Sequence, residues 1–215
     1  MIFFFSTFNK LGITDEDLKL HQEEYLKAFN SWKSISSNSY YFVDNSITKI
    51  SDISNKNLLD VCWDIHDFGI VIPHIILSKE YISDTITGTF ELFKLTIKLI
   101  LNNKIKFEDD YVFFVIGRRE LSGSNTIINI DFSNKQFDYI FLNDPNDNYS
   151  ISDNLFICKS ELLMVINNFL LINPEIDNYQ KLLQRLYNDS KLSSKIISNV
   201  GLSYYDHTSN KNLLY

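Results

Sequence analysis

Apolar residues recur at helical spacing early in the chain, and the first such stretch predicts a helix over residues 15 to 33. Its apolar side chains share one face: Leu18, Tyr25, Phe29 and Trp32. Thr14 and Asp17 form a capping-box variant that marks the start of this helix. A second periodic stretch predicts another helix over roughly residues 84 to 103.

Short apolar runs between polar segments predict strands. The opening run Met-Ile-Phe-Phe-Phe predicts a first strand, and Tyr40 to Val43 predicts an edge strand within a long connection. Ile70 to Leu77 is a buried segment in which Pro73 removes a backbone donor, so any strand there is an edge strand or is broken.

The clearest strand unit follows the acidic turn at Glu108. Three successive strands are expected at 111–116, 126–132 and 137–142, and the short polar links between them predict an antiparallel meander. A loop from Asp144 to Asp153 and a short run at 155–158 come next.

The remaining pattern predicts helices. Ser160 is placed to cap a helix whose apolar face covers the sheet. Two short closing helices are expected, one around Leu182 to Leu186 and one around Ile196 to Val200, with a loose tail from Ser203.

Together these elements predict an α+β fold, an antiparallel β-meander packed against several α-helices. The 215 residues are expected to form a single globular domain. Its expected parts are a helical N-terminal part at about 1–105, the sheet and closing helices at about 106–202, and the tail at 203–215.

Charge and cysteine content narrow the possible partners. The net charge of -7 disfavours nucleic acid and anionic membranes and favours a basic partner. Cys62 and Cys158 are the only cysteines and form no metal-binding pair, so reduced, buried thiols are expected. The sequence shows neither a signal peptide nor a membrane-spanning run, which predicts a cytoplasmic protein.

The strand sequences Val-Phe-Phe-Val-Ile-Gly, Thr-Ile-Ile-Asn-Ile-Asp and Phe-Asp-Tyr-Ile-Phe-Leu are followed by a polar loop and a helix. Over residues 111 to 171 this order resembles the SUKH-type immunity proteins of bacterial toxin systems. The Leu-Pro of that family is absent between Trp32 and Asn57. The resemblance, also to immunity proteins of contact-dependent or secreted toxins, implies a non-catalytic bacterial protein that neutralises one cognate toxin.

An acidic rim is the expected binding surface. Carboxylates at the strand ends of the predicted meander suit a basic toxin, and two tyrosines supply aromatic anchors. The residues assigned to this surface are Asp131, Asp138, Tyr139, Asp144, Asp147, Tyr149 and Asp153. No cofactor is expected.

Two alternatives stay open. Cys62, Asp64, His66, Asp67 and His74 gather metal-binding residue types in one segment. His66, Asp67 and His74 are therefore the candidate ligands of a metal-dependent hydrolase. A phage-encoded or structural interaction protein fits the same composition.

Two further motifs carry possible chemistry. Arg118 and Arg119 follow a predicted strand, where they either clamp a phosphate or carboxylate or form salt bridges. Asp144, Asn146 and Asn148 imitate the start of a calcium loop, but the glycine and the bidentate glutamate are missing, so a turn is expected.

Overall fold

The computed structural model describes most of the chain, and the structural statements below concern these residues. They are 1–8, 12–33, 40–46, 71–72, 75–77, 85–102, 105, 109–121, 130, 132, 134, 136–144, 147–189, 192–197, 202–206 and 211–214.

A mixed eight-stranded sheet forms the centre of the molecule, in the order β3-β4-β2-β1-β5-β8-β7-β9. Its strands are β1 (Ile2–Ser6), β2 (Tyr40–Asp44), β3 (Val71–Ile72), β4 (Ile75–Leu77), β5 (Tyr111–Ile116), β7 (Tyr139–Asp144), β8 (Asp147–Lys159) and β9 (Ser194–Ile197). β1 pairs in parallel with both β2 and β5, β2 with β4, and β7 with β9. β8 runs antiparallel to its neighbours β5 and β7, and β3 antiparallel to β4.

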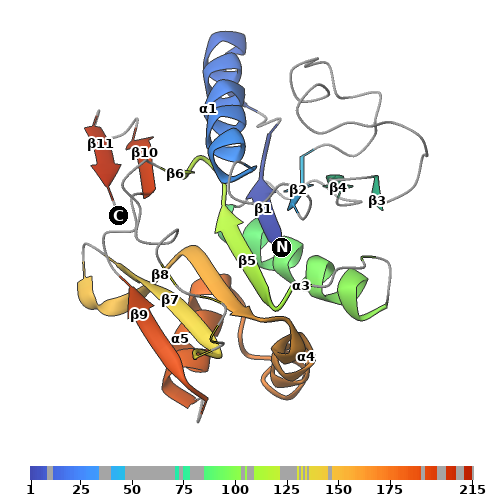
Figure 1. Cartoon of the computed structure of the whole chain (residues 1–215). Coiled ribbons are helices and arrows are strands. Elements are labelled where there is room, and N and C mark those ends of the chain that lie inside the picture. Colours follow the sequence, from blue (N-terminus) through green and yellow to red (C-terminus); the bar gives the residue numbers. More distant parts are fainter. Residues whose placement is uncertain are drawn as a thin grey trace.

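Helices cover both faces of this sheet (Figure 1). They are α1 (Asp15–Lys33), α3 (Thr85–Leu101), the short 3-10 helix η2 (Ser160–Leu162), α4 (Leu163–Ile172) and α5 (Tyr179–Asp189). α1 packs on one face, and α3, α4 and α5 pack on the other. The architecture is therefore a three-layer α/β arrangement.

The strand β1 explains why both faces are covered. All five of its residues are buried, and its phenylalanines alternate between the two cores. Phe4 packs with Phe29 of α1, whereas Phe3 and Phe5 pack with Phe114 on the other side. Strands buried on both faces are typical of parallel sheets between helices.

A second, three-stranded sheet lies beside α1. It consists of β6 (Glu120–Leu121), β10 (Leu202–Asp206) and β11 (Lys211–Leu214), in the order β11-β10-β6. Figure 1 shows it on the opposite side of the view from β3 and β4. The C-terminal hairpin thus returns to the segment that directly follows β5.

Several sequence-based expectations are confirmed. The helix at 15–33 matches α1, and Thr14 Oγ1 accepts the backbone N–H of Asp17 at 3.2 Å as a cap. The opening strand, the strand at 111–116 and the helix near Leu182 are also present, as β1, β5 and α5.

The antiparallel β-meander and the α+β class are wrong. β5 and β7 are not neighbours, because β8 lies between them and β1 pairs with β5 from the other side. The expected loop from Asp144 to Asp153 lies largely within β8, a strand that starts at Asp147. Most of the strand expected at 126–132 falls outside the described residues.

Smaller expectations are corrected as well. Tyr40 to Val43 lies inside the sheet, between β1 and β4, and is not an edge strand. The expected closing helix around Ile196 contains the strand β9, and the expected loose tail contains β10 and β11. Ser160 does not cap a helix with its side chain; it opens the 3-10 helix η2.

Candidate functional site

The order of the parallel strands reverses at β1. From β1 the chain crosses to β2 on one side, and it later returns to β5 on the other side. In open α/β sheets, ligands bind outside the carboxyl ends of the strands at such a switch point. The carboxyl ends of β1, β2 and β5, at Ser6, Asp44 and Ile116, are therefore the candidate site.

Asp44 ties the end of β2 to the end of β1. Its carboxylate is fully buried and accepts hydrogen bonds from the Ser6 hydroxyl (2.5 Å) and from the Phe8 backbone N–H (2.7 Å). The backbone N–H and the hydroxyl of Ser46 also donate to it, at 2.6 and 2.7 Å. Burial raises the pKa of this carboxyl, and the hydrogen bonds from Ser6 and Ser46 oppose that shift.

Tyr25 of α1 joins β1 to β5. Its hydroxyl accepts the Thr7 backbone N–H at 3.2 Å, and its ring stands edge-on to His21 with centroids 4.9 Å apart. At Gly117, directly after β5, an added Cβ would lie 1.9 Å from Tyr25 Cε1 and 2.5 Å from the Phe5 carbonyl oxygen. Only glycine permits this close approach of the β5 end to α1.

Arg118 follows in a left-handed conformation. Its φ of 62° is the only positive φ of a non-glycine residue among the described part of the chain. The guanidinium Nη1 lies 3.2 Å from Glu24 Oε2 on α1, with the two side chains 29% and 20% exposed. Strained backbone of this kind gathers at functional sites, where the surrounding structure holds it in place.

Arg119 is fixed at both its backbone and its side chain. Its carbonyl oxygen accepts the indole N–H of Trp32 at 2.7 Å, and its Nε donates to Asn154 Oδ1 at 2.7 Å. Asn154 lies in β8 and is buried, so Arg119 connects α1 to the neighbouring strand of β5. Two of the chain's three arginines thus follow β5 in the sequence, with the side chain of Arg118 bonded to α1 and that of Arg119 bonded to β8.

The carboxyl ends of β1, β2 and β5 lie together because β2 and β5 both pair in parallel with β1. Burial raises the pKa of Tyr25, whereas Arg118 and Arg119 lower it and Asp44 raises it further. The arginines and Asp44 therefore act on one phenol. Forked guanidinium groups beside polar backbone suit an anion with several oxygens, such as a phosphate or diphosphate.

The structure describes the side chains of three residues of the expected acidic rim, Asp138, Tyr139 and Asp153. Tyr139 is 1% exposed and lies in the core, so it cannot anchor a partner at the surface. The carboxylate of Asp138 is engaged with Lys159 at 2.7 Å and with Ser193, and Asp153 lies in β8. The backbone of Asp144, Asp147 and Tyr149 lies in β7 and β8, and Asp131 falls outside the described residues.

The metal-site hypothesis falls outside the described part of the chain, which contains neither His66, Asp67 nor His74. Among the residues that the structure describes, no group of three His, Cys, Asp or Glu side chains is arranged to hold a metal ion. The calcium-loop imitation is not a loop throughout, since Asn148 belongs to β8.

The sequence pointed to a binding role for Arg118 and Arg119, but it gave no such role to Asp44, Tyr25 or Gly117. Both arginines form side-chain pairs, Arg118 with Glu24 and Arg119 with Asn154, so the salt-bridge alternative holds for Arg118. Asp44 had a usable signal, because it ends the apolar run Tyr-Tyr-Phe-Val. A polar residue at the end of β2 indicates a binding site only when β2 is known to be a parallel strand, because ligands bind at the carboxyl ends of parallel strands.

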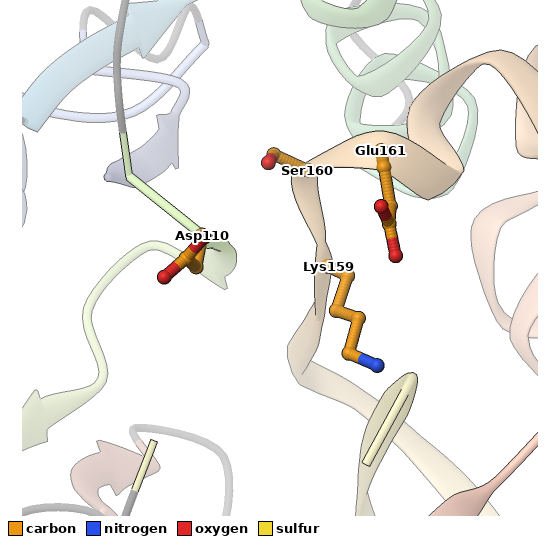
Figure 2. A pocket seen from close by; sticks show the side chains of 4 residues that line it. All are labelled: Asp110, Lys159, Ser160 and Glu161. Atoms are coloured by element: carbon orange, nitrogen blue, oxygen red, sulfur yellow. The ribbon is translucent and has the colours of Figure 1, made fainter. Parts of the chain in front are cut away.

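A separate small pocket lies near the opposite end of β5 (Figure 2). Asp110, Lys159, Ser160 and Glu161 line it, and its cavity volume is about 50 Å³. A water molecule needs only about 10–15 Å³ of such volume, so the cavity has room for water but is small for a substrate. It is also remote from the switch point, because Asp110 precedes β5 and Arg118 follows it.

The fold has clear relatives among solved structures, although no protein-family model and no curated protein matches the sequence. An inositol-1-phosphate CTP transferase from T. maritima aligns with TM-score 0.56 at 10% identity, covering 92% of this chain and 84% of that chain. A nucleoside-diphosphate-sugar pyrophosphorylase from Vibrio cholerae RC9 aligns with TM-score 0.55 at 9% identity, covering 95% of both chains.

A third similar structure is a glycosyltransferase involved in the glycosylation of the major capsid of PBCV-1. It aligns with TM-score 0.51 at 8% identity, covering 92% of this chain and 81% of that chain. At such low identity these relatives establish the fold alone.

This fold overturns the interpretation as a SUKH-type immunity protein. The structural relatives are nucleotide and sugar transferases, and none of those aligned above is a toxin-immunity protein. The predicted non-catalytic toxin inhibitor, with a basic toxin as its partner, is therefore wrong. Among the described residues, no helix is long and apolar enough to cross a bilayer.

Proposed function

We propose that this protein is an enzyme that binds a nucleotide or a nucleoside-diphosphate sugar and transfers a nucleotidyl or glycosyl group from it. The substrate's phosphates lie at the carboxyl ends of β1 and β5, beside Arg118 and Arg119. The observation that carries this proposal is the reversal of strand order at β1, with two arginines directly after β5.

The charge of the site supports an anionic substrate. The chain as a whole has a net charge of -7, which repels anions, yet two of its three arginines follow β5, where Glu24 pairs with Arg118. Asp44 is enclosed by hydroxyl and backbone donors, so its charge is compensated locally. An anion that reaches this edge of the sheet meets the arginines.

The groups around the arginines are held in fixed positions, which supports binding of a substrate phosphate in one defined geometry. Tyr25 and Trp32 of α1 and Asn154 of β8 fix the backbone or side chains around the arginines from two different elements. Groups that are held before the substrate arrives need no reorganisation when charge develops on a leaving phosphate.

The experiment is a turnover assay of the full chain with a panel of nucleoside triphosphates and nucleoside-diphosphate sugars. Release of pyrophosphate or of a nucleoside diphosphate is measured with and without added divalent cations and sugar or sugar-phosphate acceptors. Turnover of one donor class, abolished in Arg119→Gln and retained in Arg185→Gln, supports the proposal. Absence of turnover and of binding across the whole panel contradicts it.

Arg185 is a matched control because it is the chain's third arginine. It lies on α5 and pairs with Glu175 at 3.7 Å, and its side chain is half exposed. Loss of activity in both variants would indicate a general effect of lost positive charge.

A further inference from the structure

Glu24 occupies the position on Arg118 that an incoming anion needs. We infer that Glu24 is an internal competitor for the substrate's phosphate group: its carboxylate pairs with Arg118 in the free protein and releases it when phosphate binds. This inference rests on the proposed function and adds a residue that sets which ligands the site accepts.

One face of α1 also makes contacts that hold the segment after β5 in place while Glu24 gives way to a phosphate. Lys27 pairs with Glu120 at 2.8 Å, and the Ser31 hydroxyl accepts the Leu121 backbone N–H at 2.8 Å. Positions 24, 27 and 31 lie on one face of a helix, so the segment after β5 runs along α1. When Glu24 releases Arg118, these other contacts still hold the segment.

The pair of Glu24 and Arg118 is partly buried, as it must be if a phosphate from solvent is to compete with Glu24 for Arg118. The Glu24 side chain is 20% exposed and the Arg118 side chain 29%, so a ligand reaches them from solvent while water screens the pair less than a fully exposed pair. By contrast, the Lys19 to Glu23 pair on the same helix is 79% and 58% exposed, and its N–O distance is 4.0 Å. A carboxylate accepts two parallel hydrogen bonds from a guanidinium group, and so does a phosphate. A phosphate can therefore take the place of the Glu24 carboxylate on the guanidinium group of Arg118.

Two chemical consequences follow for the ligand. A phosphate or diphosphate carries more negative charge than a carboxylate and displaces Glu24, whereas an uncharged ligand does not. Glu24 therefore selects for ligands that carry phosphate and lowers their apparent affinity by the strength of its own pair with Arg118.

The test uses the full chain as wild type and as Glu24→Gln, titrated by calorimetry with uridine diphosphate, inorganic pyrophosphate and uridine. The glutamine variant keeps the shape of the side chain and loses its charge. We expect roughly threefold to tenfold tighter binding of uridine diphosphate and pyrophosphate, with uridine binding unchanged. Glu23→Gln, one residue away on the same helix, is the control and leaves all three affinities unchanged.

The outcomes separate this inference from the proposed function. Equal affinity of wild type and Glu24→Gln for the phosphate ligands overturns the inference, while phosphate-dependent binding in both leaves the proposed function standing. Weaker binding in Glu24→Gln also overturns it, because Glu24 then assists the ligand. If neither protein binds any of the phosphate ligands, the inference fails, and the turnover panel decides the proposed function.

Discussion

The ring of Tyr25 closes over Gly117, so that a Cβ at position 117 would lie 1.9 Å from Cε1 of Tyr25. This contact brings α1 against the end of β5, and it places Arg118 beside Glu24. The position of the candidate site therefore depends on one residue without a side chain.

Replacement of Gly117 by alanine is expected to destabilise the protein by about 3 kcal/mol or more, because both an aromatic ring and a backbone carbonyl oxygen must move. Chemical denaturation of the variant measures this. Gly12→Ala is the control: Gly12 has a φ of 80° but open space around it. Its cost is limited to backbone strain of about 1–2 kcal/mol. Equal losses for the two variants would contradict the close approach at Gly117.

Arg118→Gly is expected to separate stability from binding. Glycine removes the strain of the left-handed backbone, and the lost ion pair with Glu24 contributes only about 0–1 kcal/mol. The unfolding free energy should stay the same or rise, while affinity for phosphate ligands falls about tenfold or more. Denaturation and calorimetry on the same sample give both values. Retained affinity would show that Arg118 does not bind the ligand.

Asp44→Asn is expected to cost about 1–3 kcal/mol of stability, because an amide nitrogen cannot accept the hydrogen bonds that the carboxylate accepts. Thermal unfolding measures the loss. Asp177→Asn serves as the control, since Asp177 is 66% exposed and pairs only with exposed groups. A loss no larger than that of the control would show that Asp44 does not join β1 to β2.

The Asp138 to Lys159 pair predicts a pH window of stability. The hydrogen bond with Lys159 lowers the pKa of Asp138, and the same bond raises the pKa of Lys159. Asp138 therefore contributes stability that is present above its ordinary pKa and is lost as pH falls through the lowered value. Lys159 contributes stability that is present below its ordinary pKa and is lost as pH rises through the raised value.

A double-mutant cycle with Asp138→Asn and Lys159→Gln measures this coupling. We expect about 1–2 kcal/mol near neutral pH, since the side chains are 19% and 16% exposed, and a decline at both pH extremes. A coupling energy that does not change with pH would contradict the ionic character of the pair.

The helices were largely predictable because their signals are local. The apolar face and the Thr14 cap of α1 lie within one stretch of sequence, and the structure matches them. The strand order of the sheet was not predictable. Short polar links around β7 favoured hairpins, whereas β1 pairs with β5 across more than a hundred residues. The fully apolar runs in β1 and β5 carried the better signal, since strands buried on both faces indicate a parallel sheet.

The candidate site was predictable only in part for the same reason. Arg118 and Arg119 are visible as a motif, but their phosphate-binding interpretation requires knowing that β5 ends beside β1. Asp44, Tyr25 and Glu24 come from distant positions and acquire their roles through packing. No sequence spacing relates them to the arginines.

The most direct test of the central claim is calorimetric titration of the wild-type chain with nucleoside diphosphates and nucleoside-diphosphate sugars, in parallel with Arg119→Gln and Arg185→Gln. We expect saturable binding of at least one nucleotide, weakened about tenfold or more by Arg119→Gln and unchanged by Arg185→Gln. Equal binding by all three proteins, or no binding by the wild type, would contradict a phosphate site at the carboxyl ends of β1 and β5.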